Sequence, residues 1–305
     1  MIETFDAHLP HGITLSCRAA GTPGQPVLLF LHGFPEAAFV WDDMLERFAR
    51  DGYRCVAPNL RGYERSSAPA EPKAYRARYL VQDMDALVEQ ICANSPTPGR
   101  VAMLVAHDWG GALAWAFAAQ HPQRMARLAI LNAPHPAPFQ RELTRSATQQ
   151  AASAYMNFLA RPDAPALLAE NDFARLWPFF TDMAASQGPH AWLDDAMRER
   201  YRAVWRQGLH GGCNYYAASP LRPPSPADPG ATAVQLPDEA VTVRVPTLVI
   251  WGEGDTVLPP SLLEGLDAWV PDLRIERLAD CTHWLVHEQP ARVASLLEDF
   301  LRQTP

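Results

Sequence analysis

The stretch AHDWGG, at residues 106–111, determines how we interpret this chain. It follows the apolar run 101–105 and opens a helical pattern over 110–121. Small residues two positions before and two and three positions after Asp108 permit a sharp turn from a strand into a helix. Such a turn presents its central side chain at the top of a parallel sheet. The stretch therefore predicts an α/β fold with Asp108 in the position of a nucleophile.

Most turns of this kind carry Ser or Cys, so an Asp at the centre indicates different chemistry. A carboxylate that attacks a saturated carbon forms a stable alkyl ester, which water must then cleave with a general base and an oxyanion hole. An ordinary Asp has a pKa of about 3.9, and the helix N-terminus further favours the anion, so Asp108 should be ionised at neutral pH. An Asp before a helix is more often an N-cap. The candidate catalytic residues described below favour the interpretation of Asp108 as a nucleophile.

Length and composition indicate a globular protein. The 305 residues are 48% hydrophobic and 20% charged, with a net charge of −8, which argues against nucleic acid or an anionic membrane as a partner. We find no secretory signal and no apolar run near the roughly 18 residues of a membrane span. The five cysteines are scattered, so we expect reduced thiols in a cytoplasmic protein and no metal site. We also expect no cofactor.

Short apolar strands alternate with helices in two parts of the chain. In the first part we expect strands at 27–31, 54–57, 101–105 and 128–131, and helices at 41–50 and 79–93. In the second part we expect strands at 247–251 and 274–278, and helices at 262–269 and 290–302. This pattern is typical of a mostly parallel, doubly wound sheet, in which active groups gather beyond the carboxyl ends of the strands.

Residues 136–241 lack the strand pattern and carry helical segments. We expect them to form a helical lid inserted into a core made of residues 1–135 and 242–305, because neither part of the sheet is complete alone. Aromatic residues of the lid suggest an apolar or aromatic substrate, although such side chains also simply pack. These residues are Phe158, Trp177, Phe179, Phe180, Trp192 and Trp205.

Two further residues complete a catalytic trio with Asp108. Asp255 and His283 each follow a predicted strand, and their order is that of nucleophile, acid and base in the α/β-hydrolase fold. We expect His283 to activate water and Asp255 to orient its imidazole. Asp280 is a competitor for the acid. Asn132, which follows the strand at 128–131, cannot serve as the acid.

The loop HGFPE, at residues 32–36, follows the first buried strand and is the expected oxyanion loop. The backbone N–H groups of Phe34 and Trp109 would face the developing oxyanion. We interpret His32 as a brace of this loop and place His32, Pro35 and Trp109 at the substrate pocket. The bond between Phe34 and Pro35 is a candidate for the cis form.

These motifs resemble the epoxide hydrolase branch of the α/β-hydrolases. The resemblance runs from about residue 13 to residue 301 and includes RGYERSSAP at residues 61–69. It implies two lid tyrosines that protonate the opening epoxide, since an alkoxide leaving group needs an acid. Tyr155, seven residues before a proline, and Tyr216, which closes the run NYY at 214–216, match these positions. Tyr215 is the alternative to Tyr216, and Thr282 stands where relatives usually have Gly.

Two other functions remain open from the sequence. A haloalkane or haloacetate dehalogenase would use the same Asp108 nucleophile, but the first favours a polar residue where this chain has Phe34. The second favours arginines where this chain has Trp109 and Ala112. A ligand-binding relative without catalysis would not need His283 placed for water. We therefore predict an epoxide hydrolase that forms a vicinal diol from a small epoxide and water, of unknown oligomeric state.

Overall fold

The computed structural model describes residues 1–183 and 191–303. Its centre is an eight-stranded sheet in the order β1-β2-β4-β3-β5-β6-β7-β8. The strands are β1 (Glu3–His8), β2 (Thr14–Ala20), β3 (Val27–Leu31), β4 (Arg54–Pro58), β5 (Met103–His107), β6 (Leu128–Leu131), β7 (Thr247–Gly252) and β8 (Leu273–Leu278). β2 is antiparallel to both β1 and β4, and all other neighbours are parallel. The predicted mostly parallel sheet is confirmed.

Helices cover both faces of the sheet because successive strand residues point to opposite sides. Leu28 and Phe30 pack toward α1 (Asp42–Arg50) and α12 (Pro290–Arg302). Their neighbours Leu29 and Leu31 pack on the other face, toward α2 (Ala77–Ile91) and α3 (Asp108–Gln120). The short helix α11 (Leu285–Glu288) precedes α12. Burial on both faces explains why the central strands are apolar throughout.

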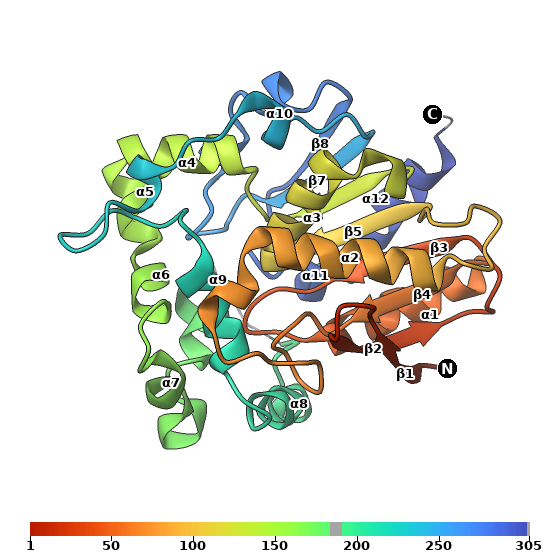
Figure 1. Ribbon diagram of the computed structural model, residues 1–305, viewed down its shortest axis with the longest axis horizontal. Coiled ribbons are helices and arrows are strands. Elements are labelled where there is room, and N and C mark those ends of the chain that lie inside the picture. The colour runs from red at the N-terminus through yellow and green to blue at the C-terminus, as the bar shows by residue number, and fades with distance from the viewer. Residues whose placement is uncertain (184–190, 304–305) are drawn as a thin grey trace.

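The segment between β6 and β7 is helical. It contains α4 (Pro136–Arg145), α5 (Ala147–Ala152), α6 (Ala154–Leu159), α7 (Ala164–Phe173), α8 (Asp195–Trp205), α9 (His210–Ala218) and α10 (Asp238–Val241). Figure 1 shows α4 to α7 and α9 at the left of the view, away from the N-terminal hairpin of β1 and β2, with α8 at the lower edge. These helices occupy the region that we predicted as a lid, residues 136–241.

Two features of the fold differ from the sequence expectations. The helix predicted at 262–269 is replaced by two short 3₁₀ turns, Pro260–Leu263 and Leu266–Ala268, separated by Gly265 with φ +73°. The strands β1 and β2 were not anticipated; they extend the sheet with an antiparallel edge. Within residues 1–183 and 191–303, no helix is long and apolar enough to cross a membrane.

Candidate active site

Asp108 stands at the junction of β5 and α3 with a left-handed backbone, φ +49°. This conformation is uncommon for a residue other than glycine and is typical of strained functional turns. The turn is tight: a Cβ on Gly110 would lie 2.6 Å from the carbonyl oxygen of His32, and one on Gly111 would lie 2.2 Å from Cβ of Ala133. The small residues in AHDWGG therefore have the steric reason that the sequence suggested.

The oxyanion loop after β3 holds the Asp108 carboxylate. The backbone N–H of Phe34 donates a hydrogen bond to Oδ1 of Asp108 over 2.7 Å, and the Phe34–Pro35 peptide is cis. The other carboxylate oxygen of Asp108, Oδ2, lies 3.8 Å from Nε2 of His283.

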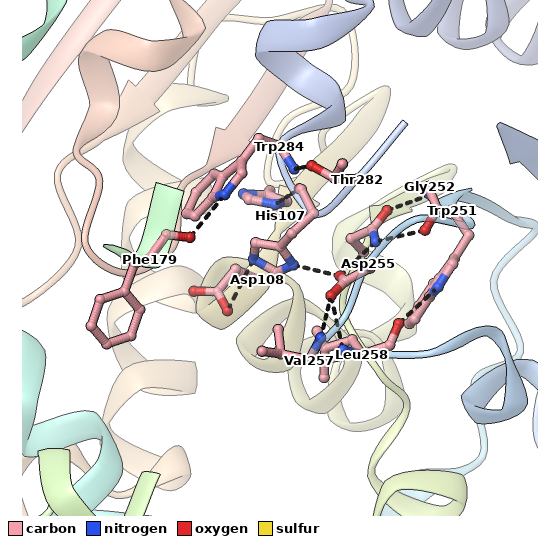
Figure 2. A network of polar contacts seen from close by, with 12 residues as sticks. His107, Asp108, Phe179, Trp251, Gly252, Asp255, Val257, Leu258, Thr282 and Trp284 are labelled. Carbon is pink, nitrogen blue, oxygen red and sulfur yellow. Dashed lines mark hydrogen bonds and ion pairs between the residues drawn. The ribbon is translucent and has the colours of Figure 1, made fainter. Parts of the chain in front are cut away.

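His283 lies between the carboxylates of Asp108 and Asp255, both of which are labelled in Figure 2. Its Nδ1 is 2.7 Å from Oδ2 of Asp255, and its Nε2 is 3.8 Å from Oδ2 of Asp108. Burial alone would lower the pKa of His283, but the neighbouring carboxylates, Asp255 above all, raise it to about 9. The ring is thus oriented by Asp255 and faces the carboxyl group of Asp108. This is the geometry expected of a general base for water attack at that group.

The loop around His283 is also braced by Thr282, the residue that departs from the usual Gly. Both its backbone N–H and its hydroxyl donate to the carboxylate of Glu288, each over 2.7 Å. The backbone N–H of Trp284 donates in turn to the Thr282 hydroxyl. The departure therefore adds hydrogen bonds beside the base.

Asn132 was set aside in the sequence because an amide cannot act as the acid, yet it contacts the acid directly. Its Nδ2 donates to Oδ2 of Asp255 over 2.8 Å, and its Oδ1 accepts from the backbone N–H of Gly252. Oδ1 of Asp255 accepts from the backbone N–H groups of Val257 and Leu258. Asn132 follows β6 with φ +37°, a conformation that Asn tolerates better than most residues. We did not predict this contact with Asp255 from the sequence.

Glu36 is a second residue that the sequence did not indicate. Its buried Oε1 accepts hydrogen bonds from the Tyr201 hydroxyl over 2.7 Å and from Nε2 of His287 over 2.6 Å. Oε2 lies 3.4 Å from Nδ1 of His107, whose Nε2 donates to the backbone oxygen of His283. Burial opposes a charge on Glu36, but the two histidines hold its pKa well below the usual range. The buried carboxylate of Glu36 is thus connected to the backbone of His283 through His107.

His32 acts within its loop, as expected. Its Nε2 accepts from the backbone N–H of Leu60, and its Nδ1 donates to the carbonyl oxygen of Gly33. Pro35 accepts the indole N–H of Trp205 through its carbonyl oxygen. Both residues are buried in these contacts, so neither belongs to the wall of the cavity described next. Of the three predicted pocket residues, only Trp109 lines it.

A cavity of about 320 Å³ opens beside Asp108. Trp109, Tyr155 and Tyr216 share its wall with the Asp108 carboxyl group. The ring centroids of Tyr155 and Tyr216 lie 6.0 Å apart, with the edge of one ring toward the face of the other. Burial, reinforced by the negative charge of Asp108, raises the pKa of both hydroxyls. Both tyrosines are therefore neutral proton donors at physiological pH.

Tyr215, the alternative to Tyr216, is engaged elsewhere. Its hydroxyl donates to the backbone oxygen of Arg61, and Arg61 forms a buried bidentate ion pair with Asp83. At the same seam, a Cβ on Gly211 of α9 would lie 2.1 Å from the carbonyl oxygen of Gly62. The backbone of α9 at Gly211 therefore lies directly against the backbone of the loop at Gly62. Both Tyr215 and Tyr216 line the cavity, but the Tyr215 hydroxyl is already used in its hydrogen bond to Arg61.

The six aromatic residues from which we expected an apolar or aromatic substrate pack elsewhere in the structure. None of the six, all of which the structure describes, lines this cavity. Trp177, Phe180 and Trp205 contact one another, and Trp192 stacks on His287 with ring centroids 4.2 Å apart. These residues form the packing of the helical segment. They give no evidence about the substrate.

Comparisons with known proteins agree with this geometry. The sequence pattern of the alpha/beta hydrolase fold matches residues 26–290. Mouse epoxide hydrolase 4 is 31% identical over 297 residues, which cover 96% of this chain and 77% of that protein. The chain therefore belongs to the α/β-hydrolase fold family. Within that family, it belongs to the epoxide hydrolase branch.

Solved structures extend the similarity over the whole chain. An epoxide hydrolase from metagenomes of hot environments has a TM-score of 0.86 and 35% identity, with 100% of both chains covered. A mutant of the Bacillus megaterium epoxide hydrolase, complexed with its product (R)-3-[1]naphthyloxy-propane-1,2-diol, has a TM-score of 0.82 and 26% identity. That similarity covers 98% of this chain and 100% of the other.

Proposed function

We propose that this chain hydrolyses epoxides to vicinal diols through a covalent alkyl ester on Asp108. The observation that carries the proposal is the shared cavity, which holds a carboxylate nucleophile and two neutral tyrosine hydroxyls. The epoxide hydrolases similar to this chain support the substrate class. The B. megaterium relative was solved with a diol product, which is the kind of product that we propose here.

In the first step, Oδ2 of Asp108 attacks one epoxide carbon. The bond from that carbon to the epoxide oxygen breaks as the ester bond forms. Tyr155 or Tyr216 gives its proton to the departing oxygen, which becomes the first hydroxyl of the product. Since an alkoxide is nearly as basic as hydroxide, this proton transfer distinguishes an epoxide from a halide, which leaves without an acid. The tyrosine pair therefore favours the epoxide hydrolase over the dehalogenase alternative.

In the second step, His283 takes a proton from water, and the hydroxide attacks the carboxyl carbon of Asp108. Negative charge develops on the ester carbonyl oxygen, which the N–H of Phe34 stabilises, with the N–H of Trp109 proposed as the second donor. As this intermediate collapses, the proton on His283 passes to the leaving alkoxide oxygen and the diol is released. The second proton of the water, now on the Asp108 carboxyl group, returns to the tyrosinate formed in the first step, which restores both the Asp108 carboxylate and the neutral tyrosine.

The charge of Asp108 connects the two steps. In the free protein it helps to raise the pKa of His283 to about 9, so the imidazole is protonated at neutral pH. Esterification removes that charge, and the pKa of His283 falls as a consequence. The first step thus prepares the base for the second. Asp255 continues to hold the ring after the ester has formed.

We also propose that residues 136–241 act as a lid, because Tyr155 and Tyr216 come from this segment while Asp108, Asp255 and His283 come from the loops of the sheet. A cytoplasmic location is supported by the five cysteines, all of them buried and free. A reducing compartment is where such thiols are usual. The expected ligands are a small epoxide and water.

A single turnover in ¹⁸O-labelled water tests the proposed intermediate. Water attacks the carboxyl carbon, so the label should enter Asp108 and appear in the digested peptide that contains residues 106–111. The first equivalent of diol should carry unlabelled oxygen from the enzyme. Label found only in the product, with none in that peptide, would contradict the covalent mechanism.

A further inference from the structure

One stripe of α3 runs along the wall of the cavity. Asp108, Ala112, Ala116 and Gln120 follow one another at intervals of four residues, and all four are wall residues. None of the four is fully buried, whereas Ala114, Phe117 and Ala118 between them are buried and do not line the cavity. At about 1.5 Å per residue, the stripe runs for about 18 Å from the nucleophile to the end of the helix. The cavity is therefore elongated along α3.

The wall facing this stripe is apolar and comes from the end of α9 and the segment before β7. Leu221 follows α9, Val234 and Leu236 precede α10, and Val241 ends α10. Distal wall residues Gln120, Pro220 and Ala240 are exposed, so the far end of the cavity reaches the surface. The reactive end holds Asp108 and the tyrosines; the distal end has no charged wall residue.

Two alanines keep this path open. Ala112 and Ala116 lie one and two turns beyond Asp108, where a larger side chain would project into the cavity. Ala116 is about 12 Å along the helix from Asp108. At about 1.25 Å per bond of an extended chain, roughly ten chain atoms bring a substituent past Ala116.

We propose that the preferred substrates are epoxides with one elongated, uncharged apolar substituent that lies along α3, and that Ala116 sets the length which the cavity accepts. This inference rests on the proposed epoxide hydrolysis and adds the substrate class to it. Each methylene buried against the apolar wall contributes to binding of both substrate and transition state. The value of kcat/KM should then rise by up to about fourfold per methylene.

The test is a series of 1,2-epoxyalkanes with four, six, eight and ten carbons. For the wild-type protein we expect kcat/KM to rise along the series. For Ala116→Phe we expect the ratio of kcat/KM for the ten-carbon epoxide to that for the four-carbon epoxide to fall at least tenfold. Leu236→Trp, which fills the same region from the opposite wall, should lower this ratio too and decides the question if Ala116→Phe does not fold.

Ala291→Phe is the matched control. Ala291 is exposed on α12 and does not line the cavity, so this variant should keep the wild-type ratio. A wild-type ratio that does not rise with chain length would overturn the inference. So would a ratio that stays within twofold of wild type in Ala116→Phe, or in Leu236→Trp if the first variant is unfolded. Absence of any epoxide turnover and of any adduct on Asp108 is a different result, since it contradicts the proposed function itself.

Discussion

Two sides of the active site, the core and the proposed lid, are held by different interactions. On the core side, Asp255 accepts hydrogen bonds from Asn132, His283 and two backbone N–H groups, so the acid and base have one defined orientation. On the lid side, Tyr216 contacts Phe34, Trp109 and Tyr155 through ring edges. Directional bonds suit a base that must activate one water molecule. Apolar packing suits acids that must stay neutral.

From this difference we propose that the two sides serve different half-reactions. Substitutions on the core side, at the acid and base, should slow hydrolysis of the ester, and the adduct should accumulate. Substitutions of the lid tyrosines should slow formation of the ester, so no adduct should accumulate. The following predictions test that assignment.

The largest effect is expected for His283→Gln. This variant should lose about 10²–10⁴-fold in turnover because no base activates water, while Asp108 still attacks the epoxide. Intact-mass spectrometry should show the protein mass increased by the mass of one substrate molecule. If the variant loses turnover but carries no adduct under any substrate concentration, the assignment of His283 to the second step is wrong.

The double variant Tyr155→Phe with Tyr216→Phe should lose roughly 10²–10³-fold in the rate of ester formation, since no acid meets the alkoxide. Stopped-flow mixing with excess protein measures that rate. Tyr215→Phe is the control: it removes the hydrogen bond to Arg61 and should cost about 1 kcal/mol of stability with little change in ester formation. An accumulated ester in the double variant would reverse the assignment of the two sides.

Asn132→Gly should slow ester hydrolysis by about tenfold, the kinetic equivalent of about 1.4 kcal/mol, because Asp255 loses one buried donor. Glycine adopts the positive φ of this position without strain, so the variant isolates the loss of the amide. Rapid-quench measurement of ester decay gives the rate. A decay rate equal to wild type would mean that the backbone donors alone hold Asp255.

The smallest change concerns a pKa. Asp108→Asn removes one of the charges that raise the pKa of His283 to about 9, so the pKa should move downward in this variant. In the wild type, ester hydrolysis should increase with pH up to a pKa below about 9, because hydrolysis needs the neutral imidazole and the ester has no charge at Asp108. NMR titration of the histidines gives the pKa of His283 in Asp108→Asn. The pH dependence of ester decay gives the pKa that governs hydrolysis in the wild type.

Asp280→Asn is the control for that titration, because Asp280 is the nearby competitor that the sequence left open. It should leave the titration of His283 in place, whereas Asp255→Asn should lower the pKa. If Asp280→Asn lowers the pKa of His283 as much as Asp255→Asn does, the choice of Asp255 as the acid is contradicted.

The sequence predicted those parts of the molecule that depend on local pattern. The small residues around Asp108, the order of Asp255 and His283, the apolar strands and the epoxide hydrolase resemblance all lie in short stretches, and the fold and family are confirmed. The helix at 290–302 has the predicted bounds. The prediction at 262–269 was wrong because Gly265, with φ +73°, interrupts the helical pattern.

The residues that were missed act across the sheet. Asn132 and Asp255 are 123 positions apart, and Glu36 and His287 are 251 positions apart, so no local spacing connects them. Long-range contacts also explain why two pocket predictions were wrong. His32 and Pro35 belong to the loop at 32–36, but their hydrogen bonds to Leu60 and Trp205 hold them inside the protein and off the cavity wall. The roles of the predicted catalytic residues stay predictions that the experiments above test.

The close approach of Gly62 and Gly211 has a consequence for how this enzyme can be altered. Neither backbone leaves room for a side chain at that contact, and the helix seated there carries Tyr216. Substitutions at this contact would displace α9 and, with it, Tyr216. Libraries aimed at new substrates should instead randomise the cavity wall at 218–221 and 234–241, where changes alter the shape of the cavity without moving Tyr155 and Tyr216.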